Sequence, residues 1–167
     1  NGATMCIVTQ RMISFPKELI PYLNEKKITT VIWAVSALAL TASFKGLEKQ
    51  VPLYLKKIMF SGEVMPVKVL NYWREKLPDA MYVNLYGPTE ITCNCSYYVV
   101  DREFALGESL PVGVPFPNTD MFVLNEKNEL VGENEIGEIC VRGTSLALGY
   151  YRNQEATSRA FCQNPLN

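Results

Sequence analysis

Residues 56–90 read KKIMFSGEVMPVKVLNYWREKLPDAMYVNLYGPTE, and this stretch decides the fold class. Two short apolar runs, 56–61 and 80–85, have the length of buried strands. Pro66 and Pro78 bound the segment between them, in which apolar residues recur at helical spacing. A strand, a helix and a second strand in this order predict a right-handed crossover between two parallel strands.

The same alternation extends toward the N-terminus. A β-prone apolar run at 3–9 precedes a helical pattern at 16–27, which contains Pro21 and is therefore expected to kink or to begin late. A β-branched run at 29–34 predicts another buried strand, and Ser36 is a candidate N-cap for the helix that follows. Strands that alternate with helices predict an α/β fold with a mainly parallel sheet and flanking helices.

The second half of the chain has a different character, because proline and glycine become frequent. Strand-like runs at 120–124 and 136–142 flank a polar turn, and a short helical pattern follows at 155–161. This pattern predicts a small antiparallel β unit. We therefore expect two subdomains, an α/β subdomain at 1–107 and a β-rich subdomain at 108–167.

Composition excludes several classes of function. The 167 residues carry a formal net charge of −1, so no basic surface indicates a nucleic-acid or membrane partner. The longest apolar run, 31–42, is shorter than the roughly 18 residues that a membrane-spanning helix requires. The chain has no histidine, which removes Ser-His and Cys-His catalysis. Its five cysteines show no CxxC spacing, which is typical of reduced thiols in a cytoplasmic protein.

The two predicted strand ends at 61–63 and 84–90 carry the polar residues that suit a ligand site. Open α/β sheets bind ligands beyond the carboxyl ends of their strands. At the second of these ends, a hydroxyl (Thr89) beside a carboxylate (Glu90) suits a phosphate and its Mg²⁺. Tyr86 offers a flat face to a base, and the Asn84 amide can pair with a purine edge.

The residues alone leave a structural alternative open. In it, the Gly-Pro turn simply ends the strand, Thr89 caps a helix, and Glu90 lies near the positive end of the helix dipole. Gly62 and Glu63 have a similar alternative, an ordinary turn between a strand and a helix. No Gly-x-x-x-x-Gly-Lys loop is present to grip a triphosphate.

Three segments resemble the motifs of amino-acid adenylation domains, which occur in nonribosomal peptide synthetases and in D-alanine-activating ligases. Residues 84–90 are similar to the N-x-Y-G-P-T-E signature of this family. Residues 137–161, with Gly137-Glu138-Ile139 and Gly149-Tyr150, resemble its next core motif, and 60–66 resemble its G-E-x-x-P segment. The similarity covers nearly the whole chain, and a proline at position 88 favours amino acids over the acids used by related acyl-CoA ligases.

The resemblance implies an enzyme that joins an amino acid to AMP, releases pyrophosphate, and passes the acyl group to the phosphopantetheine thiol of a carrier protein. It implies ATP or AMP and Mg²⁺ as cofactors, with Thr89 and Glu90 as the catalytic residues and Glu90 as the metal ligand. The nucleotide would contact Gly62, Glu63, Asn84, Tyr86, Gly87 and Thr89. The residues implied for the amino-acid pocket are all uncharged, which favours a neutral substrate: Met59, Ser61, Leu85, Cys93 and Asn94.

Other motifs of the family are missing from these 167 residues. They are the phosphate loop, the aspartate that clamps the substrate amine, the T-G-D motif and the catalytic lysine of the C-terminal domain. We therefore expect a central fragment of a larger adenylate-forming fold that has no adenylation activity alone. Two other functions stay open: an acyl-CoA-type ligase of the same superfamily and a non-catalytic nucleotide-binding domain.

Overall fold

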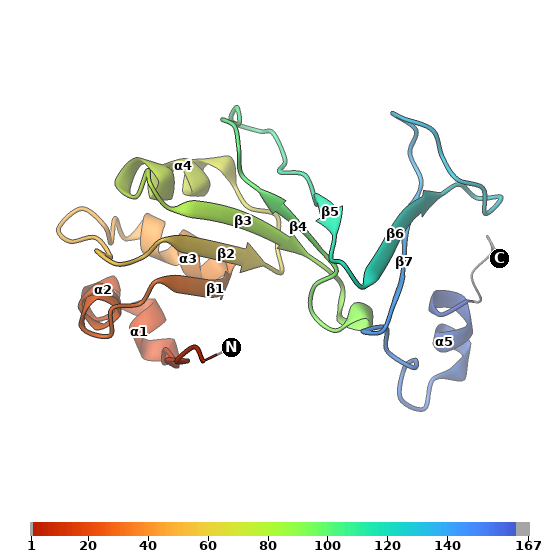
Figure 1. Cartoon of the computed structure of the whole chain (residues 1–167), viewed down its shortest axis with the longest axis horizontal. Helices are drawn as coiled ribbons and strands as arrows, with labels where there is room; N and C mark the ends of the chain where they lie inside the picture. The colour runs from red at the N-terminus through yellow and green to blue at the C-terminus, as the bar shows by residue number, and fades with distance from the viewer. Residues whose placement is uncertain (1, 163–167) are drawn as a thin grey trace. The chain divides into compact units, whose positions relative to one another are not determined.

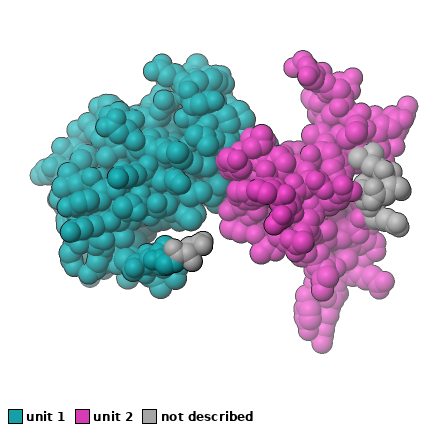
Figure 2. Space-filling view, viewed as in Figure 1, with its two compact units in different colours: residues 1–85, 98–112 teal, residues 86–97, 113–167 magenta. Residues whose placement is uncertain are grey.

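The computed structural model describes residues 2–162, which divide into two compact units. The first unit comprises Asn1–Leu85 and Tyr98–Val112, and the second comprises Tyr86–Tyr97 and Gly113–Asn167 (Figure 2). None of the helices in the described part of the chain is long and apolar enough to cross a membrane. The subdomain boundary expected between residues 107 and 108 stays a prediction.

The first unit contains the predicted parallel sheet, and β1, β2 and β3 lie side by side in it (Figure 1). β1 pairs with β2 in parallel from Thr30↔Lys57 to Ala34↔Ser61, and β2 pairs with β3 in parallel from Lys57↔Met81 to Phe60↔Asn84. The α/β prediction is therefore confirmed. Its elements are α1 (Gln10–Ser14), α2 (Pro16–Glu25), β1 (Thr30–Ala34), α3 (Val35–Ser43), β2 (Lys57–Ser61), α4 (Val67–Lys76) and β3 (Met81–Tyr86).

Two further strands follow β3 along the chain. They are β4 (Ser96–Val99) and β5 (Val114–Pro115), which pair antiparallel to each other. Just after β4, the Val100 N–H donates to the Tyr82 carbonyl at 2.9 Å. The sequence predicts neither strand, because both are shorter than the apolar runs that mark β1 to β3.

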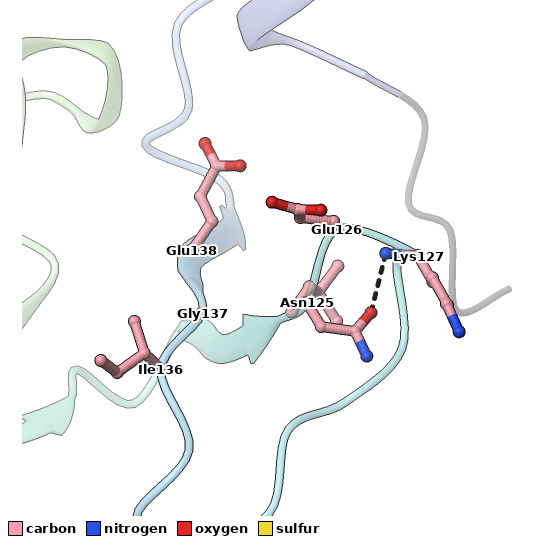
Figure 3. A pocket seen from close by; sticks show the side chains of 7 residues that line it. Asn125, Glu126, Lys127, Ile136, Gly137 and Glu138 are labelled. Atoms are coloured by element: carbon pink, nitrogen blue, oxygen red, sulfur yellow. Dashed lines mark hydrogen bonds between the residues drawn. The ribbon is translucent and has the colours of Figure 1, made fainter.

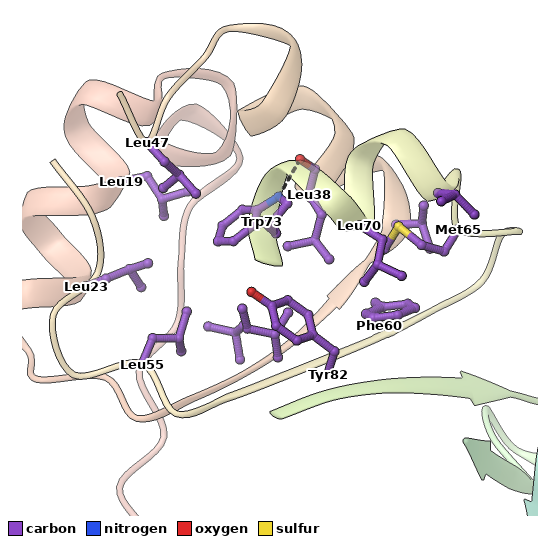
Figure 4. Close-up of a cluster of buried hydrophobic side chains, with 14 of the residues drawn as sticks. Leu19, Leu23, Leu38, Leu47, Leu55, Phe60, Met65, Leu70, Trp73 and Tyr82 are labelled. Carbon is purple, nitrogen blue, oxygen red and sulfur yellow. Dashed lines mark hydrogen bonds between the residues drawn. The ribbon is translucent and has the colours of Figure 1, made fainter. Parts of the chain in front are cut away.

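The core of the first unit forms where the apolar face of α4 meets the sheet (Figure 4). Val67, Leu70 and Trp73 follow one another at three-residue spacing on α4 and are all buried. Ile58 and Phe60 alternate with partly exposed residues along β2 and are fully buried. Burial of each such side chain stabilises the fold by about 1.5–3 kcal/mol. The Trp73 indole N–H donates to the Leu38 carbonyl at 3.0 Å, so its polar atom is also satisfied.

Three local predictions in this unit differ from the structure. Helix α2 begins at Pro16 and runs through Pro21, so it does not begin late, and the exposed position of Pro21 lets water bind the carbonyl that lacks an N–H partner. Ala34, not Ser36, precedes the first turn of α3, because β1 passes into the helix without a loop. The apolar run at 3–9 forms no regular element.

The second unit contains the small antiparallel sheet that the sequence predicts. Strand β6 (Thr119–Leu124) pairs with β7 (Glu138–Gly143), and Gly137 lies at the end of this hairpin where the connecting loop joins β7. A Cβ at Gly137 would lie 2.5 Å from the Leu124 carbonyl oxygen, so the close approach of the strands requires glycine. The other elements of the unit are the short 3₁₀ helix η1 (Thr89–Ile91) and α5 (Gln154–Ala160).

Candidate adenylate site

In the first unit, the carboxyl ends of β2 and β3 bring one group of predicted site residues together. The register pairs Met59 with Val83 and Phe60 with Asn84, so the residues after these pairs meet at one edge of the sheet. Gly62 there has a φ of +90°, a conformation that favours glycine, and a Cβ on it would meet nothing within 4 Å. The residues at this edge are Met59, Ser61, Gly62, Glu63, Asn84 and Leu85.

The Asn84 amide has a defined orientation in this edge. The side chain is 9% exposed, and its Nδ2–H donates to the Pro111 carbonyl at 2.9 Å. A carbonyl only accepts, so this bond fixes which end of the amide is the nitrogen. The Asn84 Oδ1 therefore serves as an acceptor, which suits an exocyclic amino group such as that of adenine.

In the second unit, the chain after Tyr86 folds back on Gly87. The Cys95 N–H donates to the Tyr86 carbonyl at 2.7 Å. A Cβ on Gly87 would lie 2.5 Å from the Cα of Asn94 and 2.8 Å from the Cys93 carbonyl oxygen. Only glycine permits this backbone contact, and the predicted Gly87 therefore shapes the turn that carries its neighbours.

Thr89 and Glu90 begin the single turn of η1. Pro88 occupies the N-cap position and no side chain caps the helix, so the alternative in which Thr89 is a helix cap is wrong. The Thr89 side chain is exposed. The Glu90 carboxylate accepts a hydrogen bond from the Tyr150 hydroxyl, which lowers the pKa of Glu90 below its ordinary value, and a backbone hydrogen bond lowers it further. An ionised carboxylate is the form that a cation requires.

The loop beyond η1 holds the last two predicted residues, Cys93 and Asn94. Thr92 and Cys93 have positive φ values of 58° and 82°, which are uncommon for residues with a side chain. The Asn94 Nδ2–H donates to the Cys93 sulfur at 3.3 Å, while the Asn94 Oδ1 is buried without a partner. An acceptor in this state fits a ligand that donates a hydrogen bond.

Tyr150 is the residue that the sequence alone does not place in the site. It belongs to a segment that resembles a motif of the adenylation family, but the residue pattern around it is explained equally well by a strand followed by a loop, without a role in the site. Contact between Tyr150 and Glu90 spans 60 positions of the chain, which no local pattern reveals. Both residues lie in the second unit.

The model of the family described as AMP-binding enzyme matches residues 1–151. The chain belongs to this family. It is 30% identical over 99% of its length to gramicidin S synthase 1 of Brevibacillus brevis, covering 14% of that protein. It is 33% identical over 96% of its length to the D-alanine–D-alanyl carrier protein ligase of Bacillus licheniformis, covering 32% of it. The delta-poly-L-ornithine synthetase of Acinetobacter baumannii is 34% identical over 98% of the chain, which covers 11% of that protein.

Solved structures agree with this placement in the AMP-binding enzyme family. The crystal structure of IdnL1 superposes with a TM-score of 0.79 at 28% identity, covering 96% of this chain and 33% of that one. The crystal structure of CmiS6 gives a TM-score of 0.78 at 31% identity, covering 95% of this chain and 39% of that one. The chain thus spans less than half of these proteins, and it shares the fold of a part of each.

Glu90 is the residue that the sequence predicts as the Mg²⁺ ligand of this AMP-binding family member. Within residues 2–162, no group of three or more Asp, Glu or Cys side chains is placed to hold a metal ion. Proteins usually bind Mg²⁺ through one or two carboxylates together with substrate phosphates and water. The half-buried Glu90 beside Thr89, whose pKa is lowered by the hydrogen bond from Tyr150, fits that mode of binding.

A separate hollow in this family member lies at the end of the β6–β7 hairpin (Figure 3). Figure 3 shows the Glu126 and Glu138 side chains beside it, and the Lys127 N–H donates to Asn125 Oδ1 at 2.9 Å. None of the predicted nucleotide or substrate residues lines this hollow. Asn125 Oδ1 also accepts from the Glu129 N–H at 3.0 Å, which is typical of an Asx turn.

Proposed function

We propose that this chain forms the central part of an amino-acid adenylating ligase. In the proposed reaction, a carboxylate oxygen of a neutral amino acid attacks the α-phosphorus of ATP. The new phosphorus–oxygen bond replaces the bond to the β-phosphate, so that aminoacyl-AMP forms and pyrophosphate leaves. The observation that carries the proposal is the turn at 86–90, where Gly87 is packed against backbone, no side chain caps η1, and the hydrogen bond from Tyr150 lowers the pKa of Glu90.

The proposed binding of the nucleotide at the strand ends rests on the hydrogen-bonding and stacking properties of the side chains there. Asn84 Oδ1, oriented by Pro111, accepts from the amino group of adenine, and Tyr86 stacks on the ring. Gly62 and Glu63 line the base, with the backbone of Gly62 open to a flat ligand. Thr89 donates its hydroxyl hydrogen to the α-phosphate, which places the reacting phosphorus.

Glu90 is proposed to hold the Mg²⁺ ion. When bound, the metal offsets the charge that builds up on the phosphate oxygens and on the leaving pyrophosphate. Glu90 and Thr89 have the complementary tasks of fixing the ion and fixing the α-phosphate. Neither transfers a proton, because electrostatic positioning is the main contribution that proteins make to phosphoryl chemistry.

The substrate is proposed to be neutral because the candidate pocket residues carry no charge. A charged side chain would lose its hydration in such a pocket without gaining a partner. The free Asn94 Oδ1 adds one acceptor to the pocket. The residues that would line it are Met59, Ser61, Leu85, Cys93 and Asn94.

A carrier-protein thiol is the proposed acceptor of the acyl group. The name of one relative, a ligase for a D-alanyl carrier protein, supports this. Activity of this kind is proposed for a longer, cytoplasmic protein that contains these 167 residues. We propose that the chain alone is inactive and that it spans two subdomains, 1–107 and 108–167.

Amino-acid-dependent exchange of pyrophosphate into ATP tests the proposal. The assay uses the full-length protein that carries this chain, with a panel of neutral and charged amino acids and of fatty and aryl acids. We expect exchange with neutral amino acids, and we expect Glu90→Ala to reduce it about 100-fold or more. The exposed Glu133→Ala, in the turn before β7, serves as the matched control and should leave the rate unchanged.

Other outcomes point to the other functions. Exchange with fatty or aryl acids alone would indicate an acyl-CoA-type ligase. Binding of AMP without any exchange would indicate a non-catalytic nucleotide-binding domain. Exchange by the 167-residue chain itself would contradict its proposed inactivity.

A further inference from the structure

Segment 145–150 reaches the loop that carries Glu90 through three hydrogen bonds. The Tyr150 hydroxyl donates to Glu90 Oε1, and the Ala147 N–H donates to the Glu90 carbonyl at 2.8 Å. The Thr92 hydroxyl donates to the Ser145 carbonyl at 2.7 Å. All of these residues belong to the second unit. The position of the Glu90 backbone and the direction of its side chain are therefore both set by one distant segment.

Tyr150 is itself held by α5. Its N–H donates to Thr157 Oγ1 at 2.9 Å, and the Thr157 hydroxyl donates to the Asn153 carbonyl at 2.7 Å. The Asn153 side chain caps the helix by accepting from Ala156 N–H at 3.1 Å. The Tyr150 ring packs edge-on against Phe161, with ring centroids 5.4 Å apart. Backbone and ring are thus fixed independently of Glu90.

Gly149 makes this arrangement possible. Its φ is +139°, and a Cβ there would lie 2.5 Å from Thr157 Cγ2. The backbone must approach Thr157 this closely for the next N–H to reach the threonine hydroxyl. The hydrogen bonds of Tyr150, Asn153 and Thr157 therefore all depend on glycine at position 149.

We propose that Tyr150 is a positioning residue that holds the Glu90 carboxylate ready for a divalent cation. The proposal rests on the metal role of Glu90 in the proposed function. A phenol that donates to Oε1 fixes the rotamer of the glutamate and leaves Oε2 to bind a cation. Partners of this kind, which orient a ligand without touching the metal, commonly tune metal affinity.

Because the group that contacts Glu90 is the neutral hydroxyl of Tyr150, it orients the carboxylate without neutralising its charge. A lysine or arginine at this place would also bind the carboxylate, but its positive charge would repel the cation and cancel the charge that attracts it. A neutral hydroxyl donor orients the carboxylate and keeps its full negative charge. It also removes the entropy cost of ordering the glutamate when the cation arrives, because the side chain is ordered beforehand.

Tyr150→Phe tests the proposal, because it deletes the hydroxyl and keeps the ring against Phe161. The neighbouring Tyr151→Phe is the matched control, since that side chain is 85% exposed and its ring contacts only Arg152 among the contacts described. The probe is Mn²⁺ with α,β-methylene-ATP and the full-length protein, followed by water-proton relaxation of the ternary complex. Exchange kinetics at varied Mg²⁺ and varied amino acid supply the second measurement.

We expect Tyr150→Phe to weaken Mn²⁺ binding about 10-fold and to raise the half-saturating Mg²⁺ by a similar factor. The KM of the amino acid should stay unchanged, and so should all parameters of Tyr151→Phe. Thr157→Val, which removes the hydroxyl that holds the Tyr150 backbone, should change Mn²⁺ affinity in the same direction by a smaller factor.

Three results would overturn the proposal, and they differ in what they say of the proposed function. Wild-type Mn²⁺ affinity in Tyr150→Phe, with loss of binding in Glu90→Ala, would reject the positioning role alone. Wild-type Mn²⁺ affinity in Glu90→Ala would reject the metal role of Glu90 and the inference with it. A lower Tm together with equal losses for metal and amino acid would make Tyr150 a purely structural residue.

Discussion

The Asn84 side-chain N–H donates to the carbonyl of Pro111 at 2.9 Å, so the loop before β5 fixes the orientation of an amide side chain on β3. Both residues belong to the first unit, and the asparagine is nearly buried. The bond directs the amide nitrogen toward Pro111 and leaves the amide oxygen as the acceptor for a ligand. This orientation makes base selectivity a property that can be measured.

We expect the full-length protein to use ATP in preference to ITP, because the keto oxygen of hypoxanthine would face the Asn84 oxygen. Asn84→Asp should raise the KM for ATP about 10- to 100-fold, since a carboxylate would lie against the Pro111 carbonyl without a donor between them. Asn71→Asp, on the exposed face of α4, is the control and should leave the KM unchanged. Equal use of ATP and ITP by the wild type would contradict the assigned orientation.

The buried phenol of Tyr82 should make the free energy of unfolding of the chain depend on pH in the alkaline range. Burial raises the pKa of its phenol above the ordinary value of 10.0, and the hydroxyl donates to the Leu77 carbonyl at 3.0 Å. Above pH 10 the unfolded chain loses this proton while the folded chain keeps it, so rising pH favours unfolding. The stabilisation is complete below pH 10 and is lost above it, by at most about 1.4 kcal/mol per pH unit.

Urea unfolding of the chain between pH 7 and pH 11.5, followed by tryptophan fluorescence, measures this effect. Tyr82→Phe should cost about 1 kcal/mol at pH 7 through the lost hydrogen bond, and its stability should fall less steeply above pH 10. Tyr54→Phe, at a 41% exposed position, is the control. Parallel curves for the wild type and Tyr82→Phe above pH 10 would show that the Tyr82 phenol ionises equally in both states.

Trp73 is the largest fully buried side chain of the first unit, and it closes the core through its bond to Leu38 (Figure 4). Trp73→Phe leaves a cavity and removes the indole bond to the Leu38 carbonyl, and we expect it to destabilise the chain by about 2–4 kcal/mol. Trp33→Phe, at a half-buried position on β1, should cost less. Thermal unfolding followed by circular dichroism measures both, and equal losses would show that α4 does not anchor this core.

The sequence predicts the sheet better than the site, and the reason is physical. Apolar runs mark β1 to β3, and two prolines bound helix α4, so the local pattern predicts these elements. Burial agrees less well in β1, which the sequence predicts as a buried strand but in which only Val31 is buried, whereas β3 is buried over most of its length. Glu90 and Tyr150 lie 60 positions apart, and Asn84 and Pro111 lie 27 apart. Such contacts depend on the tertiary path of the loops, and the spacing of residue types along the chain does not predict that path.

A similar limit explains the errors in detail. Ser36 has the chemistry of a helix cap, but α3 already begins at Val35, because the helix follows β1 directly. Pro21 has the chemistry of a helix breaker, but it lies on a face where water can replace the lost bond. In both cases tertiary placement outweighs local preference.

Gly87 supplies the last test, because its role depends on space rather than on charge. In Gly87→Ala the new methyl carbon would lie 2.5 Å from the Asn94 Cα, and since that neighbour is backbone the loop at 92–95 must move. We expect exchange activity of the full-length protein to fall about 100-fold, because a displacement of about 1 Å at a reacting centre has an effect of this size. Gly132→Ala is the matched control, since its nearest neighbour is the flexible Glu135 carboxylate at 3.6 Å. If Gly87→Ala keeps its activity while Gly132→Ala also does, the turn after β3 tolerates displacement, and the close packing at Gly87 does not position Thr89 and Glu90.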